Sequence, residues 1–220
     1  VRAIREDGAR RAVEVVIDGE TLSLSADLVV NGAGRRPAVE DLDLEAGGIR
    51  SDRGHIEVDV NLRSLTNPSV YVAGDALAAS PQLSPVASYE GRIAGENAIN
   101  DAKESPDYSS IPSAVYTVPA IASVGLDEAG AQAAGLEPVV KVNDMRDWRS
   151  AKTYAEQVAF AKVLIDPGTD RILGAHLAGH GAEEVIHLFT LAMKTQLTAS
   201  ELAAMTYAYP TFSSDLKFLV

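Results

Sequence analysis

Hydrophobic and polar residues alternate most clearly near the start of the chain, at residues 13–17 and 21–25. Such alternation is typical of strands that bury one face. The dipeptide Asp18-Gly19 separates the two stretches and favours the positive φ angles of a tight turn. The pattern therefore predicts a β-hairpin.

Two short apolar runs each end at a glycine. Residues 27–31 stop at Gly32, and residues 69–73 stop at Gly74. A continuous apolar run between turn residues is typical of a buried strand. We therefore expect buried strands at both places.

A helix of about residues 85–99 is predicted behind Ser84-Pro85, because serine favours the N-cap and proline the first helical position. Small residues on one face of this helix would let another backbone approach closely. They are Ala87, Gly91, Ala94, Gly95 and Ala98.

The polar, proline-containing residues 101–112 predict a linker. Beyond it, apolar periodicity and turn residues predict strands and helices. In order, these are a strand at 120–124, a short helix at 127–134, a strand at 138–143, a hairpin of 157–165 and 171–177, a helix of about 182–196 and a short helical tail. Strands packed by helices at one face predict an α+β domain over 111–220.

Composition excludes several classes of protein. The chain has 220 residues, 46% of them apolar, a net charge of −12 and no cysteine. Its apolar content excludes wholesale disorder, and the lack of cysteine excludes disulfides and thiolate chemistry in this chain. An acidic chain without a Lys/Arg block does not suit nucleic acid, and its apolar runs are too short to cross a bilayer. The cytoplasm is the default location.

Two local features could bind a ligand. Asp75 follows a predicted strand end, where a carboxylate can accept a sugar hydroxyl; it could equally satisfy its own turn backbone. The helix that begins near Ser84 has free N–H groups and a positive end, with no Glu or Gln to close a capping box. Those groups could meet a ligand or be hydrated.

Other polar residues leave their roles open. Arg35-Arg36 could meet a phosphate or lie in a solvated loop. His176 and His180 would lie about 13 Å apart on a strand, too far to share a metal. The tyrosines at 207 and 209 could be plain packing.

Four segments, taken in order, resemble the carboxyl half of the class I flavoprotein disulfide reductases. They are DLVVNGAGRRP, SVYVAGDALAASPQLSPVASYEGRIAGENA, YTVPAIASVGLDEAGAQAAG and YPTFSSDLKFL. This family includes glutathione reductase, dihydrolipoamide dehydrogenase, mercuric reductase and the soluble pyridine nucleotide transhydrogenases. The resemblance covers nearly the whole chain and rests on the order of the segments.

The resemblance implies an α/β plus α+β architecture in three parts. Residues 1–37 resemble the end of an NAD(P)-binding domain, residues 38–107 the carboxyl-terminal part of an FAD-binding domain, and residues 111–220 the dimerisation domain. It places Gly34 and Arg35 near NAD(P)H and implies a homodimer through the last part. The residues that it assigns to FAD are Gly74, Asp75, Leu83, Ser84, Pro85 and Ala87.

Within the FAD assignment, the resemblance implies that Asp75 bonds the ribityl hydroxyls. It also implies that Leu83 to Ala87 place the helix N-terminus against the pyrimidine edge of the flavin. The positive helix end would stabilise negative charge on the flavin.

The catalytic loop departs from the family pattern. Thiol-exchanging members read His-Pro-Thr and, after two more residues, a Glu that orients the His. Tyr209 and Ser214 stand at those two positions here. A phenol is a poor base at neutral pH. This loop is more similar to that of the soluble transhydrogenases, which implies an acceptor such as a nicotinamide nucleotide, a quinone or a metal ion.

The family's nucleotide fingerprints and redox cysteines would precede Val1, so we expect a carboxyl-terminal piece of a longer protein whose amino-terminal half is missing. The parent is then an FAD-dependent NAD(P)H oxidoreductase. Two alternatives remain: a dimerisation fragment without activity of its own, and a disulfide reductase whose cysteines lie in the missing half.

Overall fold

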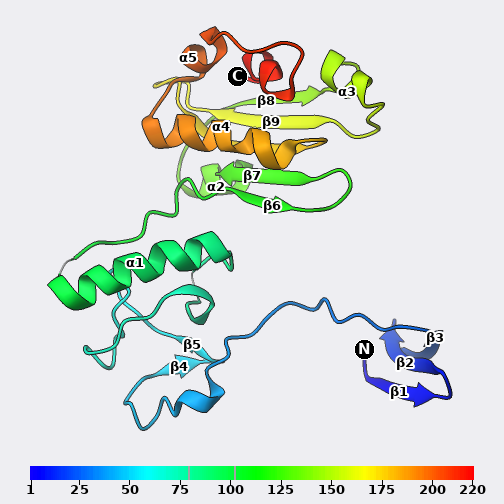
Figure 1. The fold of residues 1–220 in the computed structure, drawn as a ribbon, viewed down its shortest axis with the longest axis vertical. Coiled ribbons are helices and arrows are strands. Elements are labelled where there is room, and N and C mark those ends of the chain that lie inside the picture. The colour runs from blue at the N-terminus through cyan, green and yellow to red at the C-terminus, as the bar shows by residue number, and fades with distance from the viewer. Residues whose placement is uncertain (79, 102) are drawn as a thin grey trace. The chain divides into compact units, whose positions relative to one another are not determined.

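The computed structural model describes residues 1–78, 80–101 and 103–220 (Figure 1). The chain forms two compact units, Val1–Ala38 and Val39–Val220. Each unit is described by itself.

The first unit is a three-stranded antiparallel sheet of order β1-β2-β3. Its strands are β1 (Ala3–Asp7), β2 (Arg10–Ile17) and β3 (Glu20–Ala26). The predicted hairpin is confirmed, because Ile17 pairs with Glu20 across a two-residue turn whose Asp18 and Gly19 have φ angles of 52° and 85°. β1 is not predicted from the pattern.

The prediction of a buried strand at residues 27–31 is wrong. These residues form no strand, and Leu28 and Val30 are 77% and 80% exposed. A fully buried strand needs neighbours on both edges and cover on both faces. None of the strands in the described ranges pairs with this segment.

The second unit begins with short elements around one long helix. They are η1 (Glu40–Leu42), β4 (Ser51–Asp52), β5 (His55–Ile56), η2 (Gly74–Ala76) and α1 (Ser84–Asn100). A small apolar core holds them together, made of Ile56, Leu62, Val72, Leu77, Ile93 and Ala94.

The predicted strand at residues 69–73 is also wrong. Val72 is buried, and its N–H donates to the carbonyl of Leu62 at 2.9 Å. Tyr71 forms only an isolated bridge with Arg63. The segment is therefore extended and buried in part, but one bridge is too little pairing to make a strand.

Helix α1 confirms the predicted helix, with its start shifted by one residue. Leu83, not Ser84, is the N-cap, because its backbone is extended while its carbonyl accepts the N–H of Ala87 at 3.0 Å. On the predicted small-residue face Ala94 is buried, whereas Gly91 and Ala98 are exposed.

The predicted linker carries no helix or strand over 103–112; Ala102 lies outside the described residues. This segment is tied to α1. The amide of Asn97 bonds both backbone groups of Glu104, at 2.9 and 3.0 Å, and the hydroxyl of Tyr89 accepts the N–H of Asp107 at 2.9 Å. The segment is therefore held against α1 by these hydrogen bonds.

The rest of the chain forms a five-stranded sheet of order β6-β7-β10-β9-β8, antiparallel throughout. Its strands are β6 (Ser113–Val115), β7 (Ile121–Gly125), β8 (Val139–Asp144), β9 (Phe160–Ile165) and β10 (Ile172–Ala178). The helices are α2 (Glu128–Ala133), α3 (Arg149–Thr153), α4 (Ala182–Thr195), α5 (Ala199–Ala204) and α6 (Leu216–Leu219), with the 3-10 turn η3 (Phe212–Asp215). The predicted strands and helices are confirmed, while β6 and α3 are not predicted.

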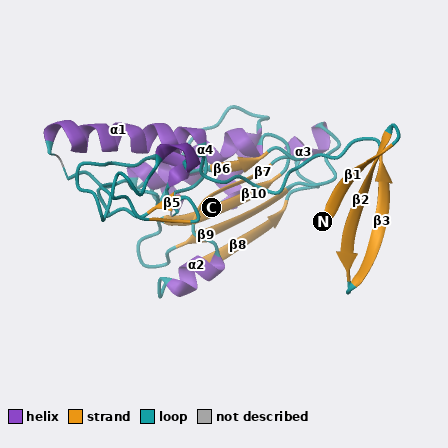
Figure 2. Cartoon of the chain, turned by 90° about the horizontal axis from the view of Figure 1, so that it is seen from below, coloured by secondary structure: helices purple, strands orange, loops and turns teal. Residues whose placement is uncertain are grey.

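Helices α4 and α2 lie on opposite faces of this sheet (Figure 2). Because side chains alternate along β10, Ala175 and Leu177 lie on the face that α4 covers, where Ile186 and Phe189 of α4 are also buried. Burial of a side chain as large as Ile186 or Phe189 contributes about 1.5–3 kcal/mol to stability. This face is the main core of the molecule.

On the other face, the chain before α2 lies directly on β10. The N–H of Leu126 donates to Leu173 at 2.9 Å, and its carbonyl oxygen lies 3.0 Å from Nε2 of His176. A Cβ on Gly174 would overlap the backbone of Leu126. The close approach therefore depends on glycine at this position.

Over residues 1–78, 80–101 and 103–220, every helix is too short or too polar to cross a membrane.

Candidate functional site

The turn at Gly74 packs directly on helix α1. Gly74 has a φ of +74°, and a Cβ built on it would lie 3.1 Å from the Cβ of Ala87. Both the backbone angle and the space therefore favour glycine, opposite a small residue on the helix. Because Ala87 belongs to the beginning of α1, the half-buried Asp75 lies near the helix end that carries Leu83.

A buried glutamate fixes this arrangement. Glu90 is 0% exposed; one carboxylate oxygen accepts the N–H of Gly74, and the other accepts the hydroxyl of Tyr108, both at 2.6 Å. Burial, and then the Glu90 carboxylate, raise the pKa of Tyr108, which keeps its hydroxyl a donor. Glu90 is not among the site residues predicted from the sequence. Its signal is the helical spacing that it shares with the buried Val86 and Ile93.

The N-terminus of α1 is open to a hydrogen-bond acceptor. Among the described residues no side chain caps it, and its first turn contains no acidic residue. Pro85 brings no N–H, while Ser84 and Val86 bring N–H groups to the positive end of the helix dipole. The structure therefore brings Gly74, Asp75 and the predicted 83–87 segment to one end of α1.

The other predicted cofactor residues, Gly34 and Arg35, belong to the Val1–Ala38 unit. Gly34 has a φ of +90°, in keeping with a glycine turn, and Arg35 is exposed.

The carboxyl-terminal loop does not join Tyr209 and Ser214 as a pair. Tyr209 is 70% exposed and precedes the cis-proline Pro210. The hydroxyl of Ser214 donates to the carbonyl of Thr211 at 2.6 Å, and its N–H donates to the hydroxyl of Thr211 at 3.1 Å. Ser214 therefore closes the η3 turn.

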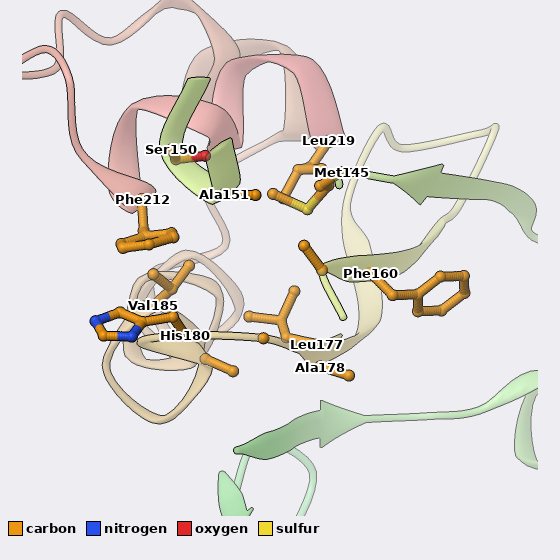
Figure 3. A pocket seen from close by; sticks show the side chains of 13 residues that line it. Met145, Ser150, Ala151, Phe160, Leu177, Ala178, His180, Val185, Phe212 and Leu219 are labelled. Carbon is orange, nitrogen blue, oxygen red and sulfur yellow. The ribbon is translucent and has the colours of Figure 1, made fainter. Parts of the chain in front are cut away.

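Three aromatic rings, those of Tyr154, His180 and Phe212, stack beside the same loop. Figure 3 shows His180 and Phe212 next to a small, mainly apolar cavity. His180 stacks on Phe212 and on Tyr154, with ring centroids 5.1 and 4.4 Å away. Nδ1 of His180 lies 3.3 Å from a carboxylate oxygen of Glu156. His176 lies on β10, as predicted, and the described ranges contain no cluster of three metal-binding side chains.

Asp215 lies under this loop, where the hydroxyl of Ser150 donates to its carboxylate. Burial raises the pKa of Asp215, and the bond from Ser150 offsets this in part. An acid whose pKa is higher in the folded state binds more protons when folded. Its contribution to stability is therefore present below the unfolded pKa and lost as the pH rises through the folded pKa.

We therefore expect Asp215→Asn to remove this loss. Urea unfolding from below pH 3.8 upwards should show the free energy of unfolding of the variant gaining on that of the parent chain as the pH rises. Asp144→Asn is the control and should show the opposite pH dependence of the free energy of unfolding, because hydrogen bonds to Arg146 lower the pKa of Asp144 to about 2. A parallel pH dependence of Asp215→Asn and the parent chain would contradict the assignment.

Comparison with protein families agrees with the fold. Residues 111–219 match the family model of the pyridine nucleotide-disulphide oxidoreductase dimerisation domain. Residues 1–91 match the family model of pyridine nucleotide-disulphide oxidoreductases. Together these matches confirm the resemblance and the predicted α/β plus α+β class.

Several curated proteins are similar to the chain. Mercuric reductase of Bacillus cereus is 34% identical over 99% of the chain, which spans 34% of that protein. Mitochondrial dihydrolipoyl dehydrogenase 2 of Arabidopsis thaliana is 36% identical over 96%, which spans 41% of that protein. An uncharacterised 19.7 kDa protein in a mercuric resistance operon of Staphylococcus aureus is 39% identical over 81% of the chain, and its whole length is covered.

Solved structures share the fold. LpdA of Mycobacterium tuberculosis has a TM-score of 0.85 and 26% identity over 99% of this chain, which covers 47% of that protein. The HOCl-induced flavoprotein disulfide reductase RclA of Escherichia coli has a TM-score of 0.83 at 24% identity over 98% of this chain, which covers 49% of that chain. With the two family models matching most of its length, the chain belongs to the pyridine nucleotide-disulphide oxidoreductase family.

Proposed function

We propose that the chain is the carboxyl-terminal part of an FAD-dependent NAD(P)H oxidoreductase, which passes hydride from nicotinamide to flavin and on to an acceptor. The observation that carries the proposal is the Gly74 turn, packed on an uncapped helix N-terminus and fixed by the buried Glu90. The sequence resemblance and the family models support the same cofactor.

The residues present fit FAD. A Cβ at Gly74 would crowd Ala87, so the turn can lie against α1 only with glycine. The carboxylate of Asp75 would accept the ribityl hydroxyls, and the N–H groups at the start of α1 would face the pyrimidine edge. When bound, FAD supplies the hydride chemistry, while these residues hold the cofactor and favour negative charge on its ring.

Asp75→Asn tests this proposal. We expect the variant of the complete protein to retain FAD at least about tenfold less tightly, because a strong acceptor of charge-assisted hydrogen bonds becomes an amide. Flavin fluorescence after equilibrium dialysis measures the dissociation constant. Asp101→Asn at the exposed end of α1 is the charge-matched control. Equal FAD affinity of the Asp75→Asn variant and the parent protein would contradict the carry-over of this residue.

We also propose that the acceptor is reduced without the usual His-Glu pair. Tyr209 is exposed, and Ser214 is engaged in its own turn, so the loop holds no oriented imidazole at these positions. This geometry favours an acceptor that needs no thiol base, such as a nicotinamide nucleotide, a quinone or a metal ion. The names of the mercury-related relatives support the metal ion as one of these acceptors.

Tyr209→Phe tests the chemical role of the phenol. If the hydroxyl acts as a general acid toward the acceptor, kcat should fall about 10²- to 10⁴-fold with little change in flavin content. Steady-state kinetics with each acceptor class measures the effect. Unchanged turnover with every acceptor would show that the Tyr209 hydroxyl has no chemical role. That result would favour the alternative of a disulfide reductase whose cysteines lie elsewhere in the protein.

A second candidate is a dimerisation module without activity of its own. The dimerisation-domain match and the fully covered relative of Staphylococcus aureus support it. The oxidoreductase and the dimerisation module both require a homodimer through residues 111–220, which light scattering of the full chain can test. A stable monomer would contradict this requirement of both candidates. A dimer that binds neither FAD nor NAD(P)H would favour the second.

A further inference from the structure

The side chain of His180 joins three segments of the chain. The residue lies in the turn between β10 and α4. Its ring centroid is 4.4 Å from that of Tyr154, which follows α3, and 5.1 Å from that of Phe212, which begins η3 (Figure 3). The rings of Tyr154 and Phe212 are themselves 5.5 Å apart, so the three rings form one cluster.

The turn that carries His180 is fixed by its backbone. The N–H of Gly179 donates to the carbonyl of Ala120 at 2.9 Å, and a Cβ on this glycine would touch the backbone of Ala159 at 3.4 Å. Gly181 has a φ of +70°, and a Cβ on it would lie 3.7 Å from the ring of Phe212. The sheet and α4 therefore set the place from which the imidazole projects.

Glu156 restrains the imidazole. One of its carboxylate oxygens lies 3.3 Å from Nδ1 of His180, and only 16% of the Glu156 side chain is exposed. The N–H of Glu156 donates to the carbonyl of Ala151 in α3 at 3.1 Å, which holds its backbone. A hydrogen bond from Nδ1 to a half-buried, anchored carboxylate sets the orientation of the ring.

The loop that carries Tyr209 needs such a support. Tyr209 is 70% exposed, three residues before Phe212. The hydroxyl of Thr211 donates to the carbonyl of Ala208 at 2.7 Å, a bond that stays within the loop. Asp215 is anchored separately, at the far end of η3. At the near end, Phe212 links the loop to the fixed turn through the ring cluster.

We propose that His180, restrained by Glu156, is the positioning residue for the loop that carries Tyr209. Contact of its ring with Phe212 fixes the start of η3, and through it the place that Tyr209 takes toward the acceptor. The inference rests on the proposed function, in which Tyr209 serves the acceptor. It adds a residue that the family resemblance does not assign.

Amide hydrogen exchange of the full chain tests the contact without any cofactor. The N–H of Ser214 donates to the hydroxyl of Thr211, so its exchange rate reports the opening of η3. We expect His180→Ala to raise this rate about tenfold, because the contact with Phe212 is lost. His187→Ala, at an exposed histidine of α4, is the matched control and should leave the rate unchanged. An unchanged rate in His180→Ala would overturn the proposal.

Two further variants keep this measurement decisive if His180→Ala folds poorly. His180→Phe retains a flat ring beside Phe212, so it should restore most of the protection that His180→Ala loses. Phe212→Leu removes the ring from the other side of the contact and should raise the exchange rate as His180→Ala does. Equal exchange rates in His180→Phe and His180→Ala, or full protection in Phe212→Leu, would overturn the proposal.

In the complete protein, rapid mixing measures the NAD(P)H step and the acceptor step separately. His180→Ala should slow the acceptor step about tenfold and leave the NAD(P)H step at its normal rate, because only the loop is displaced. Addition of Tyr209→Phe should slow the acceptor step no further than the slower single variant, since His180 acts through Tyr209. Additive losses would overturn the proposal.

The two measurements separate this inference from the proposed function on which it rests. Unchanged exchange at Ser214 in His180→Ala would overturn the positioning role alone. Faster exchange together with a normal acceptor step, in both His180→Ala and Tyr209→Phe, would overturn the proposed role of Tyr209 and the positioning role with it.

Discussion

Glu90→Ala is expected to lower the free energy of unfolding by about 3–5 kcal/mol. The substitution leaves the N–H of Gly74 and the hydroxyl of Tyr108 without their 2.6 Å acceptor in a buried place, and it opens a cavity under the turn. Denaturant titration followed by circular dichroism measures the loss.

Glu96→Ala is the matched control on the same helix. Glu96 is exposed, and within the described residues its carboxylate accepts a hydrogen bond from the Asn100 side chain alone. Its removal should therefore change the free energy of unfolding by no more than about 0.5 kcal/mol. Glu90→Gln, which keeps one acceptor oxygen, should fall between the two. A Glu90→Ala variant as stable as the Glu96→Ala control would show that the buried carboxylate does not hold the turn.

Glu90→Ala should also weaken cofactor binding at the proposed FAD site. Once Gly74 is released from α1, the backbone on either side of Asp75 is free to shift. Flavin retention by the complete protein should therefore fall in Glu90→Ala even when the measurement is made well below the unfolding midpoint. Glu96→Ala should retain FAD as the parent protein does.

Gly174→Ala is expected to cost about 4 kcal/mol or more, beyond the ordinary range for added core volume. The new Cβ would overlap the carbonyl oxygen of Leu126 and lie 2.9 Å from its carbonyl carbon. Backbone cannot rotate away as a side chain can, so β10 and the segment before α2 must separate. Loss of the bond from the N–H of Leu126 to Leu173 should accompany the change.

Gly91→Ala is the control for Gly174→Ala. Gly91 lies on the exposed side of α1 with no atom within 4 Å of an added Cβ, so alanine should stabilise the helix by about 0.5–1 kcal/mol. Thermal and urea unfolding should therefore move in opposite directions for the two glycines. A stable Gly174→Ala variant would contradict the close approach of Leu126.

The elements that the sequence predicts correctly carry local signals. The Asp18-Gly19 turn and the start of α1 each depend on neighbouring residues alone, and α4 shows its period within a single helix. The buried-strand prediction at 27–31 is wrong because an apolar run says nothing of whether neighbouring strands are present.

The parts of the site that were missed are contacts between distant residues. Glu90 meets Gly74 and Tyr108, which stand well before and well after it, and Ser150 meets Asp215 across most of the last domain. None of these three contacts has a spacing that a single sequence reveals. The resemblance supplied candidate positions near α1 but not the carboxylate that fixes them.

Glu90 also works as a junction between two stretches of backbone. Each of its oxygens is used once, one toward the turn at Gly74 and one toward the segment that leads into β6. Both stretches are therefore held to the same residue of helix α1. A ligand that binds against Gly74 would also affect, through Glu90, the position of the segment that connects α1 to β6.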